Sequence, residues 1–366
     1  MNTVSVTNRV LDVVYLRSRF ALVCHLLLVI ALGLAAYSNT FTASFNFDDV
    51  NAILGNPVVR NVDTFVDPMA VKGTRFVGIL SFALNYRLHG FTVFGYHLVN
   101  LVIHLITALL VYAMVLLTCR TPFFSGGERG DGCRLSGPIA LVAALFFVAH
   151  PLQTQAVTYI VQRVTSLATM FYLAALVLYI KARLTQGEGT RRGRMPVVII
   201  SYLLSLVAAV LAMKTKEIAF TLPFMVILFE FMFFRGSIAK RVAYLGGFIL
   251  SLAIIPLSLA GSFGGSWQFL VRLFHSTKVQ TEMPRFDYLV TQFRVIVTYL
   301  RLLFFPVGQN LDHDFTVYHT FFTPPVLLSF LLLVSIFGLG VFLVQRSTFN
   351  VQRRTTHNSL IVVSSP

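Results

Sequence analysis

The stretch HLVNLVIHLITALLVYAMVLL, residues 97–117, decides the fold class. It contains no Asp, Glu, Lys or Arg. At about 1.5 Å per residue, a helix of this length crosses the roughly 30 Å hydrocarbon core of a bilayer. Its apolar residues do not alternate with a period of two, as they would in a barrel strand. We therefore predict a transmembrane α-helix here.

Other long apolar stretches indicate that this helix belongs to a polytopic bundle. Hydrophobic residues make up 56% of the chain and charged residues 12%, whereas a soluble domain carries about 25% charged residues. Arg294 and Arg301 interrupt the run 289–305, which is either a ninth span or a helix in the membrane interface. We predict an all-α transmembrane bundle of about eight or nine spans. The remaining predicted spans are 20–37, 138–150, 164–182, 196–213, 218–234, 243–260 and 323–344.

The net charge of +15 predicts the topology, because Lys and Arg accumulate in cytoplasmic loops. If the basic segments are all cytoplasmic, both termini lie inside and the long segments 38–96 and 262–322 lie on the outer face. That topology requires 289–305 to stay on the outer side. The basic segments are 118–136, 181–195, 235–241 and 346–354.

The predicted domains are a membrane domain over 1–345 and a short polar cytoplasmic tail over 346–366. Nucleic acid is excluded as a partner, because no basic-aromatic stripe or nucleic-acid motif is present. Cys24, Cys119 and Cys133 lack the spacing of a zinc site or a disulfide framework.

The pair Asp48-Asp49, in Phe47-Asp48-Asp49 after the first span, is the sharpest candidate for chemistry. Carboxylates at a membrane surface are expensive to desolvate unless something uses them. Paired carboxylates act as a general base and as an anchor for a metal or a hydrogen bond. Adjacent residues point differently, so one can face the site while the other fixes the loop. The alternative is a solvated loop in which an Asp caps the next helix.

His97, Asn100 and His104 are spaced i, i+3 and i+7, which places them on one helix face. Polar side chains at that depth face the bundle or a wet cavity, so they are candidate substrate-pocket residues. The alternative, interhelical hydrogen bonding, is common in membranes and is favoured by the spacing alone.

His150 and Arg163 bracket a short joint between two spans. A span ends at His150, and Pro151 can open the next helix. Arg163 begins the next apolar run, where a guanidinium suits a phosphate group. The alternative is an arginine that snorkels to the surface.

Lys214, Lys216 and Glu217 form a second joint. The predicted topology places this joint and the joint 150–163 on the outer face. Two lysines there run against the positive-inside bias, so they are candidates to hold a phosphate, with Glu217 pairing one of them. The alternative is a plain interfacial turn. Asp312 and Asp314, in the outer segment with Arg301, either bind a metal or a sugar hydroxyl or belong to a simple loop.

These segments converge on one face: the outer loops carry acids and bases together, whereas the inner loops are merely basic. Such a site suits chemistry on a lipid-linked substrate. The sequence names no cofactor; a divalent cation at the carboxylates is the option that it leaves open.

The order of the motifs resembles that of the multispanning glycosyltransferases of the C superfamily (GT-C), in the branch that carries transmembrane and tetratricopeptide-repeat regions. The resemblance covers about residues 20–345, and several motifs in order are more specific than any one of them. The matching stretches are Phe47-Asp48-Asp49 with Asn56-Pro57, residues 81–86, residues 95–101 with His104, residues 150–157, Gln162-Arg163, Lys214-Thr215-Lys216-Glu217 and residues 310–315.

The resemblance implies transfer of a sugar from a polyprenyl phosphate to a hydroxyl acceptor, either protein Ser/Thr or a glycan, on the outer face. A carboxylate in the first outer loop is the base in such enzymes, which carries over to Asp48 or Asp49 without ranking them. Basic groups would stabilise the departing lipid phosphate. The candidates are Arg163, Lys214 and Lys216, followed by Arg75 and Arg301.

The resemblance leaves the donor sugar open, although eukaryotic members transfer mannose. The motifs are closer to the bacterial branch, which implies the bacterial inner membrane. Relatives continue into more spans and helical repeats, so this chain is expected to be either a short member or a truncated product. Two rival functions remain: a transporter or flippase with His97, His104 and Arg163 along its path, and a non-catalytic scaffold.

Overall fold

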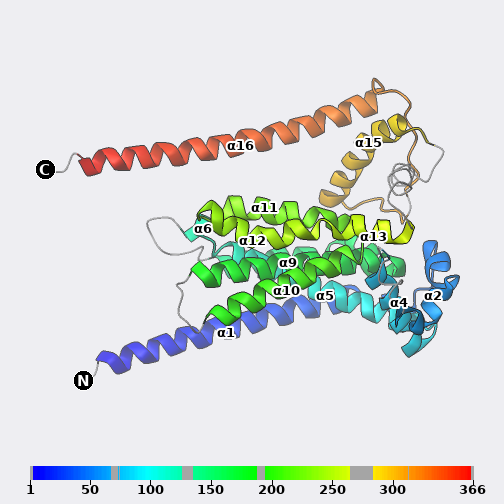
Figure 1. The fold of residues 1–366 in the computed structure, drawn as a ribbon, viewed down its shortest axis with the longest axis horizontal. Helices are drawn as coiled ribbons and strands as arrows, with labels where there is room; N and C mark the ends of the chain where they lie inside the picture. The colour runs from blue at the N-terminus through cyan, green and yellow to red at the C-terminus, as the bar shows by residue number, and fades with distance from the viewer. Residues whose placement is uncertain are drawn as a thin grey trace. The chain divides into compact units, whose positions relative to one another are not determined.

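The computed structural model describes residues 3–66, 73, 75–125, 135–187, 194–263, 283–311 and 313–363. The chain divides into two compact units, Met1–Phe269 and Leu270–Pro366. Every regular element in the described residues is helical, which confirms the all-α class (Figure 1).

The first unit is a bundle of long helices with short helical pieces at their joints. Its long helices are α1 (Thr3–Ala36), α4 (Phe76–His89), α5 (Val93–Thr118), α7 (Ser136–Ala149), α9 (Arg163–Gly187), α10 (Met195–Met213), α11 (Leu222–Phe233), α12 (Ile238–Ser251) and α13 (Ile254–Phe263). Its short pieces are η1 (Thr40–Thr42), η2 (Val50–Leu54), α2 (Pro57–Arg60), η3 (Val62–Val66), α6 (Pro122–Ser125), η4 (Pro151–Gln153), α8 (Thr154–Thr158), η5 (Ile160–Gln162) and η6 (Glu217–Thr221).

Long apolar helices confirm a polytopic membrane protein. In the described part of the chain, six helical segments are long and apolar enough to cross a bilayer, and a bent pair brings the number to seven. The predicted span 218–234 forms η6 and the shorter α11. The six are Arg19–Ala36, Val93–Thr118, Ile160–Gly187, Met195–Met213, Ile238–Ser258 and Pro324–Leu343.

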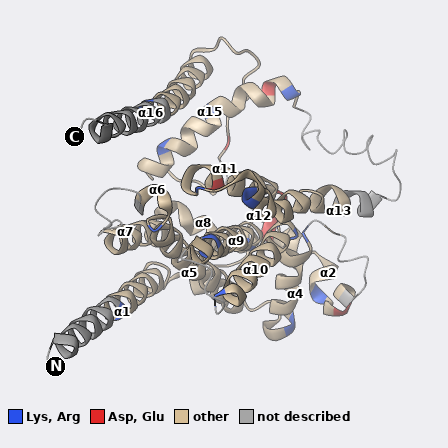
Figure 2. Cartoon of the chain, turned by 60° about the vertical axis from the view of Figure 1, so that its left-hand side comes forward, with Lys and Arg blue, Asp and Glu red and all other residues tan. Residues whose placement is uncertain are grey.

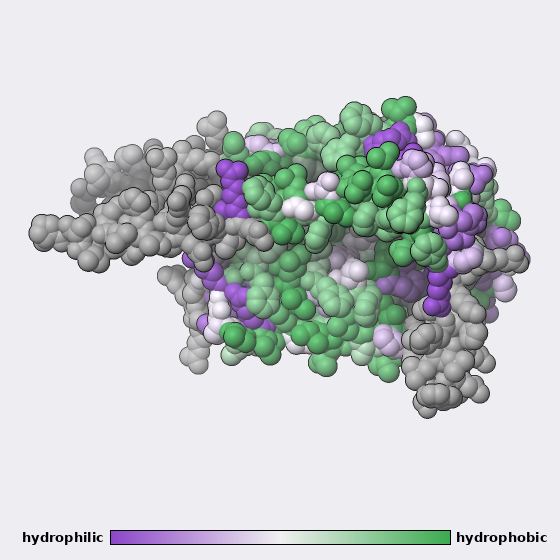
Figure 3. Space-filling view, turned by 90° about the horizontal axis from the view of Figure 1, so that it is seen from above, coloured by the Kyte–Doolittle hydropathy of each residue, from purple (hydrophilic) through white to green (hydrophobic). Residues whose placement is uncertain are grey.

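The surface of these helices is apolar, as lipid contact requires. Large side chains such as Phe146, Ile200 and Leu204 are exposed. The space-filling view is green over much of the described surface, and charged residues are sparse along the helical ribbons (Figures 2 and 3). Lipid tails solvate such faces, whereas a soluble core could not absorb them.

Close helix packing builds several apolar cores in the first unit, and two of them join its long helices. One core joins α9, α10, α11 and α12 around Tyr179, Leu222 and Phe248. The other joins α1, α5 and α7 around Val29, Ala108 and Ala144. Gly33 lets α1 approach α5 and α7, because a Cβ there would clash with the side chains of Leu105 and Val148. Small residues at helix contacts are typical of membrane bundles.

The segment between α7 and α9 departs from a straight helix. The axis bends by 50° between Ser136–Ala149 and Pro151–Thr158. Pro151 opens η4, and two more short helical pieces, α8 and η5, follow before Arg163. At about 1.5 Å per residue, α7 alone is too short to cross a bilayer. This break positions the candidate site.

The second unit contains α15 (Arg285–Phe304) and α16 (Pro324–Val363). Phe293 of α15 packs edge-on against Phe321 and Phe330. Asp287 accepts a hydrogen bond from His319 Nδ1 at 2.5 Å. Helix α15 contains most of the interrupted run 289–305, so that run is helical. Helix α16 continues through most of the predicted tail 346–366.

Candidate functional site

Asp49 fixes the first loop to the start of α9. Its Oδ1 accepts a hydrogen bond from the Val161 N–H at 2.7 Å, and its Oδ2 accepts one from the Asn46 N–H at 3.1 Å. The residue is only 1% exposed. Burial raises the pKa of the Asp49 carboxyl, although the backbone hydrogen bonds act in the opposite direction. Asp49 therefore has the geometry of an anchor.

Asp48 is the exposed member of the pair. Its N–H donates to the Tyr159 hydroxyl at 3.1 Å, which ties this residue as well to the joint before α9. Phe47 adopts a φ of 46°, a left-handed backbone that non-glycine residues seldom occupy. Strain of this kind persists where the surrounding structure imposes it and is frequent at functional sites. The two carboxylates thus take different positions, as the sequence predicted.

The polar face of α5 supplies hydrogen bonds to backbone that no regular helix satisfies. Nε2 of His104 donates to the Val148 carbonyl at 3.1 Å, where α7 ends. Nδ2 of Asn100 lies 3.3 Å from the Val157 carbonyl and 3.4 Å from the Ile160 carbonyl. Backbone groups inside a membrane must find partners within the protein. These contacts match interhelical hydrogen bonding, the alternative that the spacing favoured.

Two other predicted pocket residues bind backbone nearby. Nε2 of His97 donates to the Ala43 carbonyl at 2.9 Å, which fastens the first loop to α5. Nδ1 of His150 accepts from the Leu152 N–H at 3.2 Å and so caps the turn after α7.

Arg163 is fully buried, with 0% of its surface exposed. Its Nε donates to Asn100 Oδ1 at 2.7 Å, and its Nη2 donates to Asn85 Oδ1 and to the Tyr96 carbonyl, both at 2.9 Å. Its guanidinium also lies 4.6 Å from the centre of the Phe82 ring. These partners are neutral, so none of them offsets the positive charge of the guanidinium. It is an internal brace in this conformation, and its role toward a phosphate stays a prediction.

The predicted lysines, Lys214 and Lys216, lie in the joint between α10 and η6. Nζ of Lys216 donates to Thr165 Oγ1 at 2.6 Å, and Nζ of Lys214 donates to Ser258 Oγ. Burial lowers the pKa of both lysines. Nε of Arg75 pairs with Glu217 Oε1 at 3.3 Å. These contacts bring Arg75, Lys216 and Glu217 together near the start of α9.

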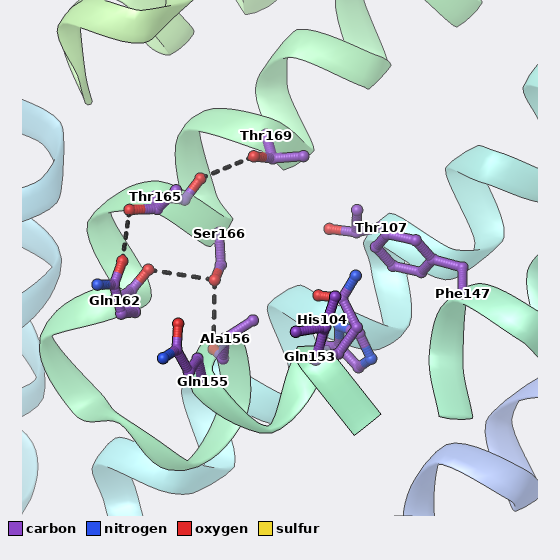
Figure 4. A pocket seen from close by; sticks show the side chains of 11 residues that line it. His104, Thr107, Phe147, Gln153, Gln155, Ala156, Gln162, Thr165, Ser166 and Thr169 are labelled. Carbon is purple, nitrogen blue, oxygen red and sulfur yellow. Dashed lines mark hydrogen bonds between the residues drawn. The ribbon is translucent and has the colours of Figure 1, made fainter. Parts of the chain in front are cut away.

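A small cavity of about 280 Å³ opens beside Thr165 (Figure 4). Amides and hydroxyls dominate its lining, and none of its lining residues is an Asp, Glu, Lys or Arg. Thr165, Ser166 and Thr169 contribute one face of α9, while Gln153, Gln155 and Gln162 come from the short helical pieces before it. His104, Thr107 and Phe147 close the other side (Figure 4). Such groups both donate and accept hydrogen bonds, as recognition of sugar hydroxyls requires.

The remaining predicted site residues belong to the second unit. Nη1 of Arg301 donates to the Val307 carbonyl at 3.1 Å, and Asp314 is exposed. Asp312 lies outside the described residues. Across the described ranges, no group of three or more His, Cys, Asp or Glu side chains is arranged to hold a metal.

Sequence reasoning missed several residues of this region. Tyr159 and Thr165 contact predicted residues directly. So does Asn85, which belonged to the matching stretch 81–86 but was given no role. Their signal was faint, because single hydroxyls and amides at helix ends are common and their partners are remote in sequence. The three glutamines at 153, 155 and 162 were quoted as motif residues, but their shared cavity becomes visible only once the segment bends.

Comparison with known proteins gives partial similarities. The Protein O-mannosyl-transferase F38B6.6 of Caenorhabditis elegans is 32% identical over 172 residues, which are 43% of this chain and 23% of that protein. The Protein O-mannosyl-transferase Tmtc3 of Drosophila melanogaster is 35% identical over 167 residues, 41% of this chain and 18% of that protein. The mouse Protein O-mannosyl-transferase TMTC3 is 28% identical over 246 residues, 63% of this chain and 24% of that protein.

These relatives confirm the resemblance that the ordered motifs indicated. The chain spans only about a fifth of the length of the curated relatives it matches, between 18% and 24% for these three. No protein-family model and no solved structure matches the chain.

Proposed function

We propose that this chain is the membrane part of a glycosyltransferase that moves a sugar from a polyprenyl-phosphate donor to a protein hydroxyl. The names of the relatives support transfer of mannose to protein. The apolar helices support a multi-pass membrane location, where a lipid-linked donor would reside. The polyprenyl phosphate, the sugar and the acceptor all belong to the proposal.

The observation that carries the proposal is the division of labour between Asp48 and Asp49. Asp49 is buried and holds the loop to Val161, which leaves the exposed Asp48 on a loop of fixed position. A general base must be within reach of the acceptor, and of the two carboxylates only that of Asp48 is exposed. We therefore assign Asp48 as the base and Asp49 as its positioning residue.

The reaction that follows from this assignment is a displacement at the anomeric carbon. Asp48 takes the proton of the acceptor hydroxyl while the oxygen of that hydroxyl forms the new glycosidic bond to the anomeric carbon. The bond from the anomeric carbon to the phosphate oxygen breaks, and the electron pair leaves with the lipid phosphate. Lys216, Lys214 and Arg75 stabilise the charge that develops on that oxygen.

The cavity beside Thr165 is the proposed place for the sugar. Its volume of about 280 Å³ is at the small end of ligand pockets, as a single sugar ring requires. Lys216 reaches Thr165 at the edge of this cavity, so a cation stands beside a neutral, hydroxyl-rich pocket. A sugar phosphate has the complementary arrangement: a neutral ring rich in hydroxyls next to a negatively charged phosphate.

We propose that this site faces away from the cytoplasm, with both termini inside. The support is the positive-inside rule: the basic loops connect the helix ends that are remote from the site, and basic loops are predicted to be cytoplasmic. The bacterial cytoplasmic membrane is the proposed location on the motif resemblance alone, since the relatives described above are animal proteins.

The test is transfer by the purified chain in lipid nanodiscs from a panel of radiolabelled polyprenyl-phosphate sugars to Ser/Thr peptides. We expect Asp48→Asn to lower the rate by about 10²–10⁴-fold, the usual range for a general base, with unchanged thermal stability. Full transfer by Asp48→Asn would remove Asp48 from the mechanism. Parallel reactions with EDTA determine whether a divalent cation takes part. Substrate counterflow without any covalent product would instead support a transporter.

A further inference from the structure

A second and larger cavity lies at the other end of the first unit. Its volume is about 640 Å³, and its lining comes from the ends of α5 and α9 and from the residues that follow α11. Arg163 and Arg183 lie on the same helix, so this cavity is about 30 Å from the candidate site along the α9 axis. It is lined by Leu117, Arg120, Lys181, Arg183, Phe234 and Arg235, among others.

Arg183 is a buried cation in the lining of this cavity, and several contacts fix it in place. Its Nε and Nη2 donate to the two oxygens of Glu230 at 2.9 and 2.6 Å, and its Nη1 donates to Gln186 at 3.1 Å. The guanidinium is sandwiched by rings, 4.9 Å from Phe234 and 4.7 Å from Tyr244. These three hydrogen bonds leave two of the five N–H donors of an arginine for another acceptor.

Among the described residues that line the cavity, positive charges outnumber negative ones. Four cations line it, and no Asp or Glu is among its lining residues. The buried Glu230 lies behind Arg183 and neutralises that one charge. Lys181 and Arg235 are exposed and add positive charge to the lining. Within the described lining, the cavity therefore presents an excess of positive charge.

The same cavity is also partly apolar. Leu117, Leu184 and Phe234 line it beside the cations. A set of loop charges that only fixes topology would be solvated and would need neither a cavity nor a buried arginine. Cations next to apolar side chains between membrane helices fit a headgroup phosphate whose acyl chain enters the bilayer.

We propose that this cavity binds a phosphate-bearing anion, with the phosphate held by Lys181, Arg183 and Arg235. Arg183 supplies planar donors that Glu230 and the two rings hold in place. Lys181 and Arg235 add charge without a fixed geometry. The proposal is independent of the proposed transfer reaction, because it uses none of the same residues.

The test compares the double variant Lys181→Gln/Arg235→Gln with a control of equal charge change, Arg87→Gln/Lys240→Gln, whose residues are exposed and outside the cavity. Native mass spectrometry measures binding of dioleoylphosphatidylglycerol and dioleoylphosphatidylcholine to the chain in detergent. A second arm measures binding of inorganic phosphate. Thermal unfolding checks that each variant is folded, and Arg235→Gln alone replaces the double variant if that one is not.

We expect the wild type to bind the anionic lipid at least about tenfold more tightly than the zwitterionic one, a preference that the cavity variant loses and the control keeps. Loss of bound inorganic phosphate in the cavity variant, with no lipid preference, would identify a free phosphate as the ligand. Equal binding by wild type and cavity variant, or equal loss in the cavity variant and the control, would overturn the proposal.

Discussion

The two buried arginines of α9 occupy opposite ends of one helix and are held in opposite ways. Arg183 is 6% exposed and pairs with the carboxylate of Glu230, which also accepts from the Tyr179 hydroxyl at 2.7 Å. Arg163 is 0% exposed, and its hydrogen bonds go to side-chain amides and backbone carbonyls. One charge is cancelled inside the protein, whereas the other is only solvated by dipoles.

This difference separates the two ends of the bundle in their electrostatics. An ion pair satisfies Arg183 and ties α9 to α11, the helix that carries Glu230. At the other end, neutral partners leave a net positive charge beneath the Asp48 loop. An uncompensated buried cation is costly, and the charge of Arg163 would suit the anionic donor proposed above.

The largest expected effect on stability comes from removing Glu230, the carboxylate that pairs with Arg183. Glu230→Ala should lower the free energy of unfolding by about 3–5 kcal/mol, because Arg183 would stay buried without a counter-charge. Denaturant unfolding in detergent, followed by circular dichroism, measures the loss. The matched control is Arg183→Met/Glu230→Leu, which removes both charges and should restore most of the stability. A loss of under 1 kcal/mol in Glu230→Ala would show that water reaches this pair.

A smaller effect is expected from a change of shape without a change of charge. Arg163→Lys should cost about 2–3 kcal/mol, since an ammonium cannot reach all the acceptors that a planar guanidinium serves. Arg183→Lys is the comparison, and it should cost less because a lysine can still pair with Glu230. The same unfolding assay ranks the two variants. The reverse ranking would mean that the neutral partners of Arg163 rearrange around a lysine.

The smallest effect concerns pH and the Asp49 anchor. Burial raises the pKa of Asp49 above its usual value of 3.8, so the folded chain binds that proton more tightly than the unfolded chain does. The stability that protonation provides is therefore complete below that usual value and is lost as the pH rises through the folded pKa. We expect the stability of the wild type relative to Asp49→Asn to decline upward from about pH 4. Stability curves at several pH values measure it, and a parallel pair of curves would contradict the expectation.

The fold class could be predicted because long apolar runs have few other solutions in water or lipid. Residues 97–117 lie inside α5, and Pro151 marked the break after α7. The end of α9 was set too early at 182, because Arg183 was interpreted as a loop charge. A lone Glu230 in an apolar stretch was the available signal, but its partner comes from another helix and no local pattern identifies it.

The candidate site was predicted in its residues more than in its contacts. Asp48 and Asp49 were singled out together, and the sequence could not rank them. The ranking proposed above depends on Val161, whose N–H donates to Asp49 across a long stretch of chain. Likewise, Lys216 was placed correctly on a joint, while its hydrogen bond to Thr165 depends on how α9 and α10 pack. Such long-range contacts have no periodicity from which to predict them.

The broken segment 150–162 also has a consequence for the order in which the chain is made. Its carbonyls at Val157 and Ile160 are served by Asn100, and its amide at Val161 by Asp49. Both partners precede the segment, and a chain folds from its N-terminus during synthesis. Asn100 and Asp49 have therefore already left the ribosome when the irregular segment emerges. The polar backbone groups of that segment can form hydrogen bonds with them at once and need not enter the lipid unpaired.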